Sequence, residues 1–274
     1  MTEPQRSSHR ARVLRYGGEA GVRVEDQLAG EEPLEIRIGG TPLTVMMRTS
    51  GHERELALGF LFGEGIIRLA ADVTAIRVLP NGEHPDLENV IDVDLAPSAP
   101  GVDRRWQRNF LAASSCGLCG VSSIEAIHQS APPLPDDDLV IDPEIIYGLD
   151  ARLRSEQAIF ARTGGLHAAG LFTLQGEPVV VREDIGRHNA VDKVIGHAVQ
   201  RGLLPLDRLI LMVSGRTSFE IVQKALQGRI PVLVAVSAPS SLARELAQAS
   251  NQTLIGFLRG RSLNVYSGRQ RIQS

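Results

Sequence analysis

Hydrophobic and polar positions change periodicity several times along the first hundred residues. Apolar and charged side chains alternate over residues 34–38, and Gly39 and Gly40 then separate this segment from a second apolar one. Alternation on both sides of a glycine turn predicts a β-hairpin, whereas apolar positions three and four residues apart predict a helix. The elements predicted here are a hairpin at 34–38 and 43–47, a helix at 53–62, and strands at 76–79 and 90–95.

From Asp142 onward, short apolar runs alternate with segments of helical periodicity. Asp142 can cap a helix that has Pro143 in its first turn, and we expect this helix to continue to about Thr163. Strands are predicted at 169–174, 179–182, 209–213, 231–236, 254–258 and 263–266, and helices at 190–200, 219–226 and 242–249. This order predicts an α/β fold, with a parallel or mixed sheet covered by helices.

The remaining segments are polar or rich in proline and glycine. Residues 1–30 are polar and irregular, and residues 96–101 and 132–138 have the composition of linkers. The predicted organisation is a flexible N-terminal segment (1–30), a small α+β domain (31–100), a flexible segment that carries both cysteines (101–140), and an α/β domain (141–274).

Composition and charge narrow the possible functions. The 274 residues are 43% hydrophobic and 22% charged, and the formal net charge of −3 gives no reason to expect a nucleic acid or a membrane surface as partner. The longest apolar runs are too short to span a bilayer. Two cysteines in a chain of this length argue against a disulfide-stapled secreted protein, so we expect a cytoplasmic one.

The two cysteines, Cys116 and Cys119, form a CxxC motif between serines and glycines. A dithiol at this spacing can cycle through a disulfide, hold half of a metal site, or carry sulfur. Ser114 and Ser115 can cap a following helix, whose N-terminus would lower the thiol pKa and favour the nucleophilic thiolate. Zinc needs four ligands, and His128 stands at no standard spacing, so no metal is expected.

Four loops follow predicted strands and are expected at one edge of the sheet, where α/β proteins bind ligands. Their arginines suit phosphate, and Phe257 suits a planar ring. Ser214, Ser240 and Asn189 are also natural helix caps, His188 can cap or pack, and His167 is expected to be structural. These loops are residues 184–189, 214–218, 237–241 and 257–262. None matches a Walker A or GxGxxG pattern.

Several segments together resemble one family. They are 55–67 (ELALGFLFGEGII), 115–120 (SCGLCG), 163–169 (TGGLHAA), 182–195 (REDIGRHNAVDKVI), 214–219 (SGRTSF) and 256–262 (GFLRGRS). They resemble the FdhD/NarQ family of formate dehydrogenase accessory sulfur carriers, over about residues 33 to 267.

The resemblance implies a sulfurtransferase, with a mixed sheet sandwiched by helices as in cytidine deaminase. It would accept sulfur from a cysteine desulfurase as a persulfide on Cys116, with Cys119 as partner thiol. The sulfur would pass to the bis(molybdopterin guanine dinucleotide) molybdenum cofactor, bound as substrate, before its insertion into formate dehydrogenase. The implied cofactor-binding residues are Phe257, Leu258, Arg259, Gly260, Arg261 and Ser262. A homodimer is expected.

Two other functions stay open from the sequence. A thioredoxin-like dithiol oxidoreductase shares the CxxC motif, although such proteins place it after a strand, often with proline between the cysteines. A zinc-bridged dimeric chaperone for formate dehydrogenase could use the same cysteines without any catalysis.

Overall fold

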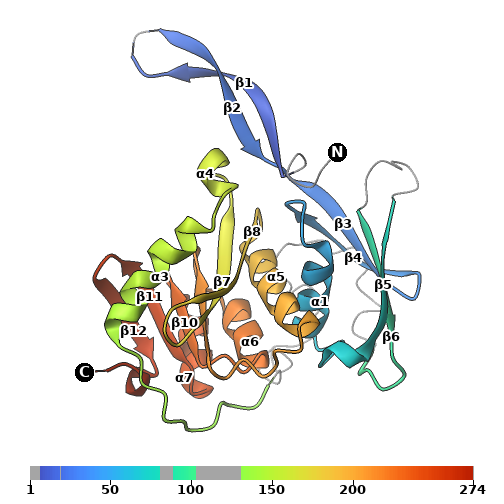
Figure 1. Cartoon of the computed structure of the whole chain (residues 1–274), viewed down its shortest axis with the longest axis vertical. Helices are drawn as coiled ribbons and strands as arrows, with labels where there is room; N and C mark the ends of the chain where they lie inside the picture. Colours follow the sequence, from blue (N-terminus) through green and yellow to red (C-terminus); the bar gives the residue numbers. More distant parts are fainter. Residues whose placement is uncertain (1–6, 19, 81–88, 103–130, 274) are drawn as a thin grey trace.

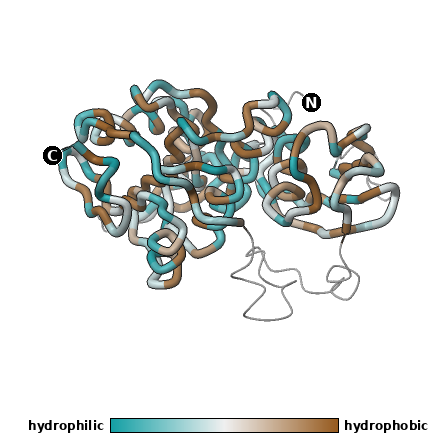
Figure 2. The backbone as a smooth tube through the Cα atoms, turned by 90° about the horizontal axis from the view of Figure 1, so that it is seen from below, coloured by the Kyte–Doolittle hydropathy of each residue, from teal (hydrophilic) through white to brown (hydrophobic). Residues whose placement is uncertain are grey.

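The structure is a computed structural model, and it describes residues 7–18, 20–80, 89–102 and 131–273. A six-stranded sheet forms the main body, and a two-stranded arm projects from one end of the molecule (Figure 1). A four-stranded unit lies to one side of this body, as the view from below shows (Figure 2). Cys116 and Cys119 lie outside the described residues.

The main sheet is mixed, with the strand order β12-β11-β10-β9-β7-β8. Its strands are β7 (His167–Thr173), β8 (Pro178–Asp184), β9 (Leu209–Val213), β10 (Val232–Ala235), β11 (Thr253–Arg259) and β12 (Ser262–Ser267). β9, β10 and β11 run parallel, while β7 is antiparallel to both β8 and β9, and β12 is antiparallel to β11. The mixed sheet predicted from the sequence is confirmed.

Helices cover both faces of this sheet, because its central strands are apolar on both sides. On β9, Leu211 and Val213 pack with α5 (Arg187–Gln200) and α6 (Phe219–Gln227), whereas Ile210 and Met212 pack with α3 (Pro143–Ser155). α7 (Ser241–Ala249) shares the face of α5 and α6. The expected sheet between layers of helices is therefore present.

The second unit has the strand order β4-β3-β6-β5 and one helix. Its elements are β3 (Glu32–Ile38), β4 (Thr41–Arg48), α1 (Glu53–Gly63), the 3₁₀ turn η2 (Ala70–Asp72), β5 (Val73–Leu79) and β6 (Val90–Leu95). α1 is buried over nearly its whole surface, because it lies between this sheet and α5 (Figure 1). One hydrophobic cluster joins Ile36 of β3, Leu61 of α1 and Ile195 of α5, so the two units share a core.

α1 and α5 cross at two glycines. A Cβ atom added to Gly59 would overlap the backbone of Asp192, and one added to Gly196 would overlap the backbone of Glu55. Hydrogen is the largest group that fits at either position, so the two helices touch backbone to backbone there.

Three expectations from the sequence are wrong in detail. Residues 8–29 are not irregular, because β1 (Ser8–Tyr16) pairs with β2 (Gly21–Ala29) to form the arm. The long helix predicted to reach Thr163 is interrupted: α4 (Phe160–Thr163) begins separately, since the Glu183 carboxylate accepts hydrogen bonds from the amides of Ile159 and Phe160. α5 starts at Arg187 rather than Ala190, so Arg187 and His188 belong to a helix.

The proline-rich segment 132–138, expected to be a linker, is fastened to the body at several points. Arg271, in the 3₁₀ turn η5 (Arg269–Arg271), is 1% exposed, and its guanidinium donates to both carboxylate oxygens of Asp137 at 2.7–3.0 Å. Arg229 donates to the carbonyl oxygens of Pro132 and Pro133. These bonds hold the segment that follows the cysteines against the body.

The helix crossing gives a first prediction. Gly59→Ala and Gly196→Ala should each destabilise the protein by about 3 kcal/mol or more, because a methyl group would force the helix backbones apart. Urea denaturation followed by circular dichroism measures this. Gly148→Ala in α3 is the matched control, since its added Cβ would have its nearest neighbour, Arg152 Nε, at 3.9 Å. Equal effects at all three glycines would contradict the close packing.

Candidate functional site

The four loops predicted to form a ligand site do meet at one edge of the main sheet. β8 runs in the same direction as β9, β10 and β11, so the carboxyl ends of these four strands share that edge. Hydrogen bonds join the loops: the Thr217 amide donates to the Ala238 carbonyl oxygen, and the Phe257 amide donates to that of Ser237, both at 3.2 Å. The amide of Ala168 donates to Ser214 Oγ at 2.8 Å. The edge is therefore a connected surface.

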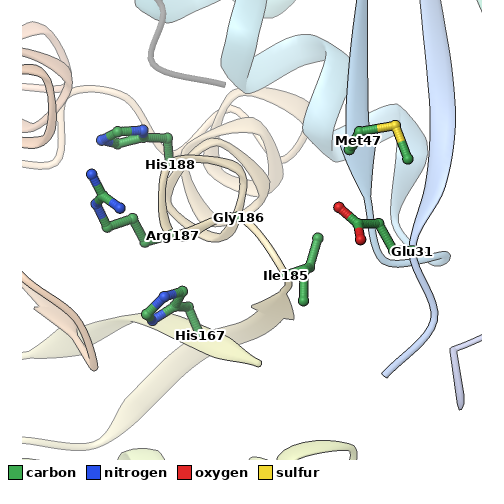
Figure 3. Close-up of a pocket in the computed structure, with 7 residues that line it drawn as sticks. All are labelled: Glu31, Met47, His167, Ile185, Gly186, Arg187 and His188. Atoms are coloured by element: carbon green, nitrogen blue, oxygen red, sulfur yellow. The ribbon is translucent and has the colours of Figure 1, made fainter. Parts of the chain in front are cut away.

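A cavity of about 400 Å³ opens at the end of this edge, between the main sheet and the smaller unit. Figure 3 shows three basic side chains, from β7 and the first turn of α5, opposite Glu31 and Met47. The residues that line it are Glu31, Met47, His167, Ile185, Gly186, Arg187 and His188. Of the four predicted loops, only 184–189 contributes to this cavity.

Asp184 holds the cavity-lining loop in place. Its carboxylate is fully buried, lies 2.7 Å from Lys193 Nζ, and accepts hydrogen bonds from the amides of Gly186 and Thr49. Asn189 donates from its side-chain amide to Asp184 and to the carbonyl oxygen of Met47. These contacts connect the start of α5 to the smaller unit and fix both walls of the cavity.

Arg187 lines the cavity, and Arg216 is close enough to affect His167, while Glu31 is the acidic residue in the lining. Burial lowers the pKa of His167, and the nearby charges of Arg187 and Arg216 lower it further. Arg187 Nε is buried and has no hydrogen-bond partner among the described residues. The first residues of α5 also line the cavity, and the dipole of a helix favours an anion at its N-terminus. Together these groups suit a negatively charged ligand such as a phosphate.

A buried acid lies behind the cavity wall. His188 Nε2 is 2.9 Å from Ser218 Oγ and 3.1 Å from Glu220 Oε2. Burial raises the pKa of Glu220 to about 7, and the charge of Lys224 opposes this rise. Because Ser218 and Glu220 both approach the same imidazole nitrogen, this is not the relay of a serine hydrolase, in which the acid and the hydroxyl use different nitrogens.

The residues predicted to bind the cofactor lie in and beside the hairpin between β11 and β12. Phe257 has φ 53°, a left-handed conformation that is rare for a bulky residue, and 37% of its surface is exposed. The Arg259 guanidinium lies 5.9 Å from the centre of the Phe257 ring, and Arg261 pairs with Glu144 of α3. Leu258 is fully buried in the core. These residues share the edge with the cavity but do not line it, and their role in binding stays a prediction.

Of the three loop residues expected to cap helices, one does so. Ser240 does cap α7, where its hydroxyl accepts from the amide of Ala243. Ser214 and Asn189 do not cap helices, since Ser214 binds β7 and Asn189 lies in the first turn of α5.

Reasoning from the sequence missed Glu220 and the Asp184–Lys193 pair. A charged residue within an apolar helical face, such as Lys193, is the signal that could have indicated buried ion pairs.

A comparison with family models decides the family. The FdhD/NarQ family model matches residues 29–273. The chain belongs to the FdhD/NarQ family. The resemblance inferred from the sequence motifs is thereby confirmed over nearly the whole chain.

Relatives within the FdhD/NarQ family cover nearly all of this chain. A Streptomyces avermitilis protein named sulfur carrier protein FdhD is 49% identical over 271 residues, which cover 97% of this chain and 96% of that protein. A Mycobacterium tuberculosis protein of the same name is 48% identical and covers 97% and 98% of the two chains. A crystal structure of a candidate formate dehydrogenase accessory protein from Desulfotalea psychrophila has a TM-score of 0.79 at 24% identity, covering 97% of this chain and 100% of that one, which shows a shared fold.

No helix among the described residues is long and apolar enough to cross a membrane. Nor does that part of the chain hold a group of three or more His, Cys, Asp or Glu side chains arranged to bind a metal ion.

The raised pKa of Glu220 predicts a pH-dependent stability. An unfolded glutamate loses its proton near pH 4.5, whereas Glu220 in the folded chain keeps it up to about pH 7. The folded state binds more protons between these values, so this stabilisation is complete below the unfolded pKa and is lost as pH rises through the folded one. We expect Glu220→Gln to show a smaller fall in the thermal unfolding midpoint than the wild type between about pH 5 and pH 8.

Glu177→Gln, in an exposed turn, is the control and should follow the wild-type profile. The imidazole of His188 lies 3.1 Å from Glu220, and the charged groups that act on Glu220 are Lys224, Glu64, Asp192 and Arg187. Identical profiles for the wild type and Glu220→Gln would show that Glu220 does not titrate in this range.

Proposed function

We propose that this chain is a sulfur carrier that supplies sulfur to the molybdenum cofactor of formate dehydrogenase. What carries the proposal is the similarity, at almost half of all positions and over 97% of the chain, to proteins named sulfur carrier protein FdhD. The CxxC motif at Cys116 and Cys119 supplies thiols able to carry sulfur. The cytoplasm is the proposed location, because its reducing conditions keep such a dithiol available for reaction.

The proposed chemistry uses both cysteines. The Cys116 thiolate attacks the terminal sulfur of a persulfide on a cysteine desulfurase, which forms the Cys116 persulfide and releases the desulfurase thiolate. Cys119 can then attack Cys116 Sγ, which yields a Cys116–Cys119 disulfide and hydrosulfide, and an external thiol reduces that disulfide. Direct transfer of the terminal sulfur from Cys116 to the cofactor is the alternative route. It releases the Cys116 thiolate as the leaving group, and the acceptor supplies the two electrons that convert the zero-valent sulfur into a sulfide.

The proposed substrate of the second step is the bis(molybdopterin guanine dinucleotide) form of the cofactor. Its phosphates suit the cavity at the start of α5, where Arg187 Nε lacks a partner among the described residues. Its guanine suits the exposed face of Phe257, beside Arg259. The cavity volume of about 400 Å³ fits one end of this large ligand rather than all of it.

The sulfur step is tested by the intact mass of the protein after incubation with a cysteine desulfurase and cysteine. We expect a gain of one sulfur atom that thiol reductants remove, because a persulfide is reversible by thiols. Cys116→Ala should abolish the gain, and Cys119→Ala should retain it. A ready Cys116–Cys119 disulfide with no sulfur adduct would indicate a dithiol oxidoreductase, and bound zinc that shields both thiols would indicate a zinc-bridged chaperone.

The ligand step has a separate test. Guanosine diphosphate, which carries the guanine and pyrophosphate of the proposed substrate, should bind the wild type and Cys116→Ala with equal affinity in isothermal titration calorimetry. Arg187→Ala should weaken that binding about tenfold or more, because a charged donor to phosphate is lost. Arg162→Ala, in α4 and outside the cavity, is the matched control. Unchanged binding in Arg187→Ala would place the ligand elsewhere.

A further inference from the structure

The β1–β2 arm has little support from the rest of the described structure. β1 and β2 pair with each other over nine residue pairs, from Ser8–Ala29 to Tyr16–Gly21, and form a sheet of their own. The arm projects from the body, and α4 packs beside β2 near its base (Figure 1). A two-stranded ribbon is marginally stable in water unless something covers it.

The arm also exposes apolar side chains and open strand edges. Leu14, Tyr16, Val22 and Leu28 are 51%, 71%, 61% and 50% exposed. Among the described residues, no strand pairs with the outer edge of β1 or of β2. Unpaired amide and carbonyl groups beside exposed apolar side chains form a surface on which another strand can pair.

The sequence of β2 is complementary to itself. If two copies of β2 pair antiparallel with Val24 opposite Val24, each Arg23 stands opposite the Glu25 of the other copy. Directly opposite charges stabilise an antiparallel pair, and both pairs recur by the twofold symmetry. We propose that the β2 edges of two copies of this chain pair in this register, so that the arms form one four-stranded sheet across a dimer.

The partner strand β1 supports this register from each side. Val13 pairs with Val24 within the arm, so the central row of the four-stranded sheet would read Val13, Val24, then Val24 and Val13 of the partner subunit. On the opposite face, Arg12 pairs with Glu25, so the next row would alternate in charge from Arg12 to Glu25 and on to Arg23 of the partner subunit. Both faces of the sheet gain complementary neighbours.

The β1 edge does not offer the same complementarity. It carries Arg10, Arg12 and Arg15 and no acidic residue, so two β1 edges brought together would place only positive charges near one another. The dimer therefore forms through β2, and β1 remains the outer strand.

A cysteine cross-link tests the register. In the Cys116→Ser/Cys119→Ser background, Val24→Cys should form a covalent dimer on mild oxidation, because residues directly opposite lie about 4.5–5.5 Å apart between Cα atoms, within disulfide range. Val22→Cys is the control: the two copies of this residue would be offset by about 13 Å along the strands and should not cross-link.

Exchanging the charges on β2 tests the proposed dimer surface, with the dissociation constant measured by sedimentation velocity. Arg23→Glu should raise the dissociation constant of the dimer about tenfold or more, and Arg23→Glu/Glu25→Arg should restore it. Arg10→Glu makes the same change of charge on β1 and should leave the dimer intact. The proposal is overturned by a monomer at all concentrations, by a dimer that ignores Arg23→Glu and lacks the Val24 cross-link, or by open assemblies larger than a dimer, which would mean pairing of β1 with β2.

Discussion

The backbone contact between α1 and α5 is the constraint on which the arrangement of the two sheets depends. Gly59 and Gly196 let the helices approach closely, and the hydrophobic cluster of both units closes around them. Ion pairs surround the crossing: Glu55 accepts from Arg182 and lies 2.8 Å from His197 Nδ1, and Lys224 pairs with Asp192. Burial alone would raise the pKa of Glu55, but the hydrogen bonds from Arg182 and His197 outweigh it and lower that pKa. The crossing therefore joins the two units through packing and charge together.

These buried charges matter more for geometry than for net stability. Removing two ions from water costs about as much as their attraction returns, whereas removing one partner leaves an uncompensated charge. The buried Asp184–Lys193 pair has a structural role. Asp184 also accepts hydrogen bonds from the amides of Thr49 and Gly186, and these bonds determine where α5 begins. Asp184 therefore determines the position of Arg187 in the cavity, although the Asp184 carboxylate is itself buried and does not line the cavity.

The strands and helices after residue 160 were predictable because the strands form one sheet that helices cover on both faces. In the sequence, the buried strands are short apolar runs, and loops separate them clearly from the helical segments. The arm was missed because neither face of β1 or β2 is deeply buried, so no apolar alternation marks them. The break before α4 and the early start of α5 depend on hydrogen bonds to the carboxylates of Glu183 and Asp184. These bonds form only in the folded chain, so the local sequence pattern does not indicate them. The four loops of the candidate site were predicted from strand direction, whereas the cavity required Glu31 and Met47 from the other unit.

The two proposed steps of sulfur transfer require different things of the chain: ligand binding requires a site of fixed shape, and sulfur delivery requires that the thiols can reach that site. The edge with the cavity is held by hydrogen bonds between loops, which suits a site that must keep one shape for its ligand. Pro132, thirteen positions after Cys119, is bound by Arg229, which lies just before β10 at the opposite edge of the main sheet. Cys119 and Ala131 are twelve residue steps apart along the chain, so covalent geometry limits their separation to about 40 Å. A seven-residue strand such as β11 measures only about 23 Å, so chain length permits the thiols to meet a ligand at the far edge without any change in the body.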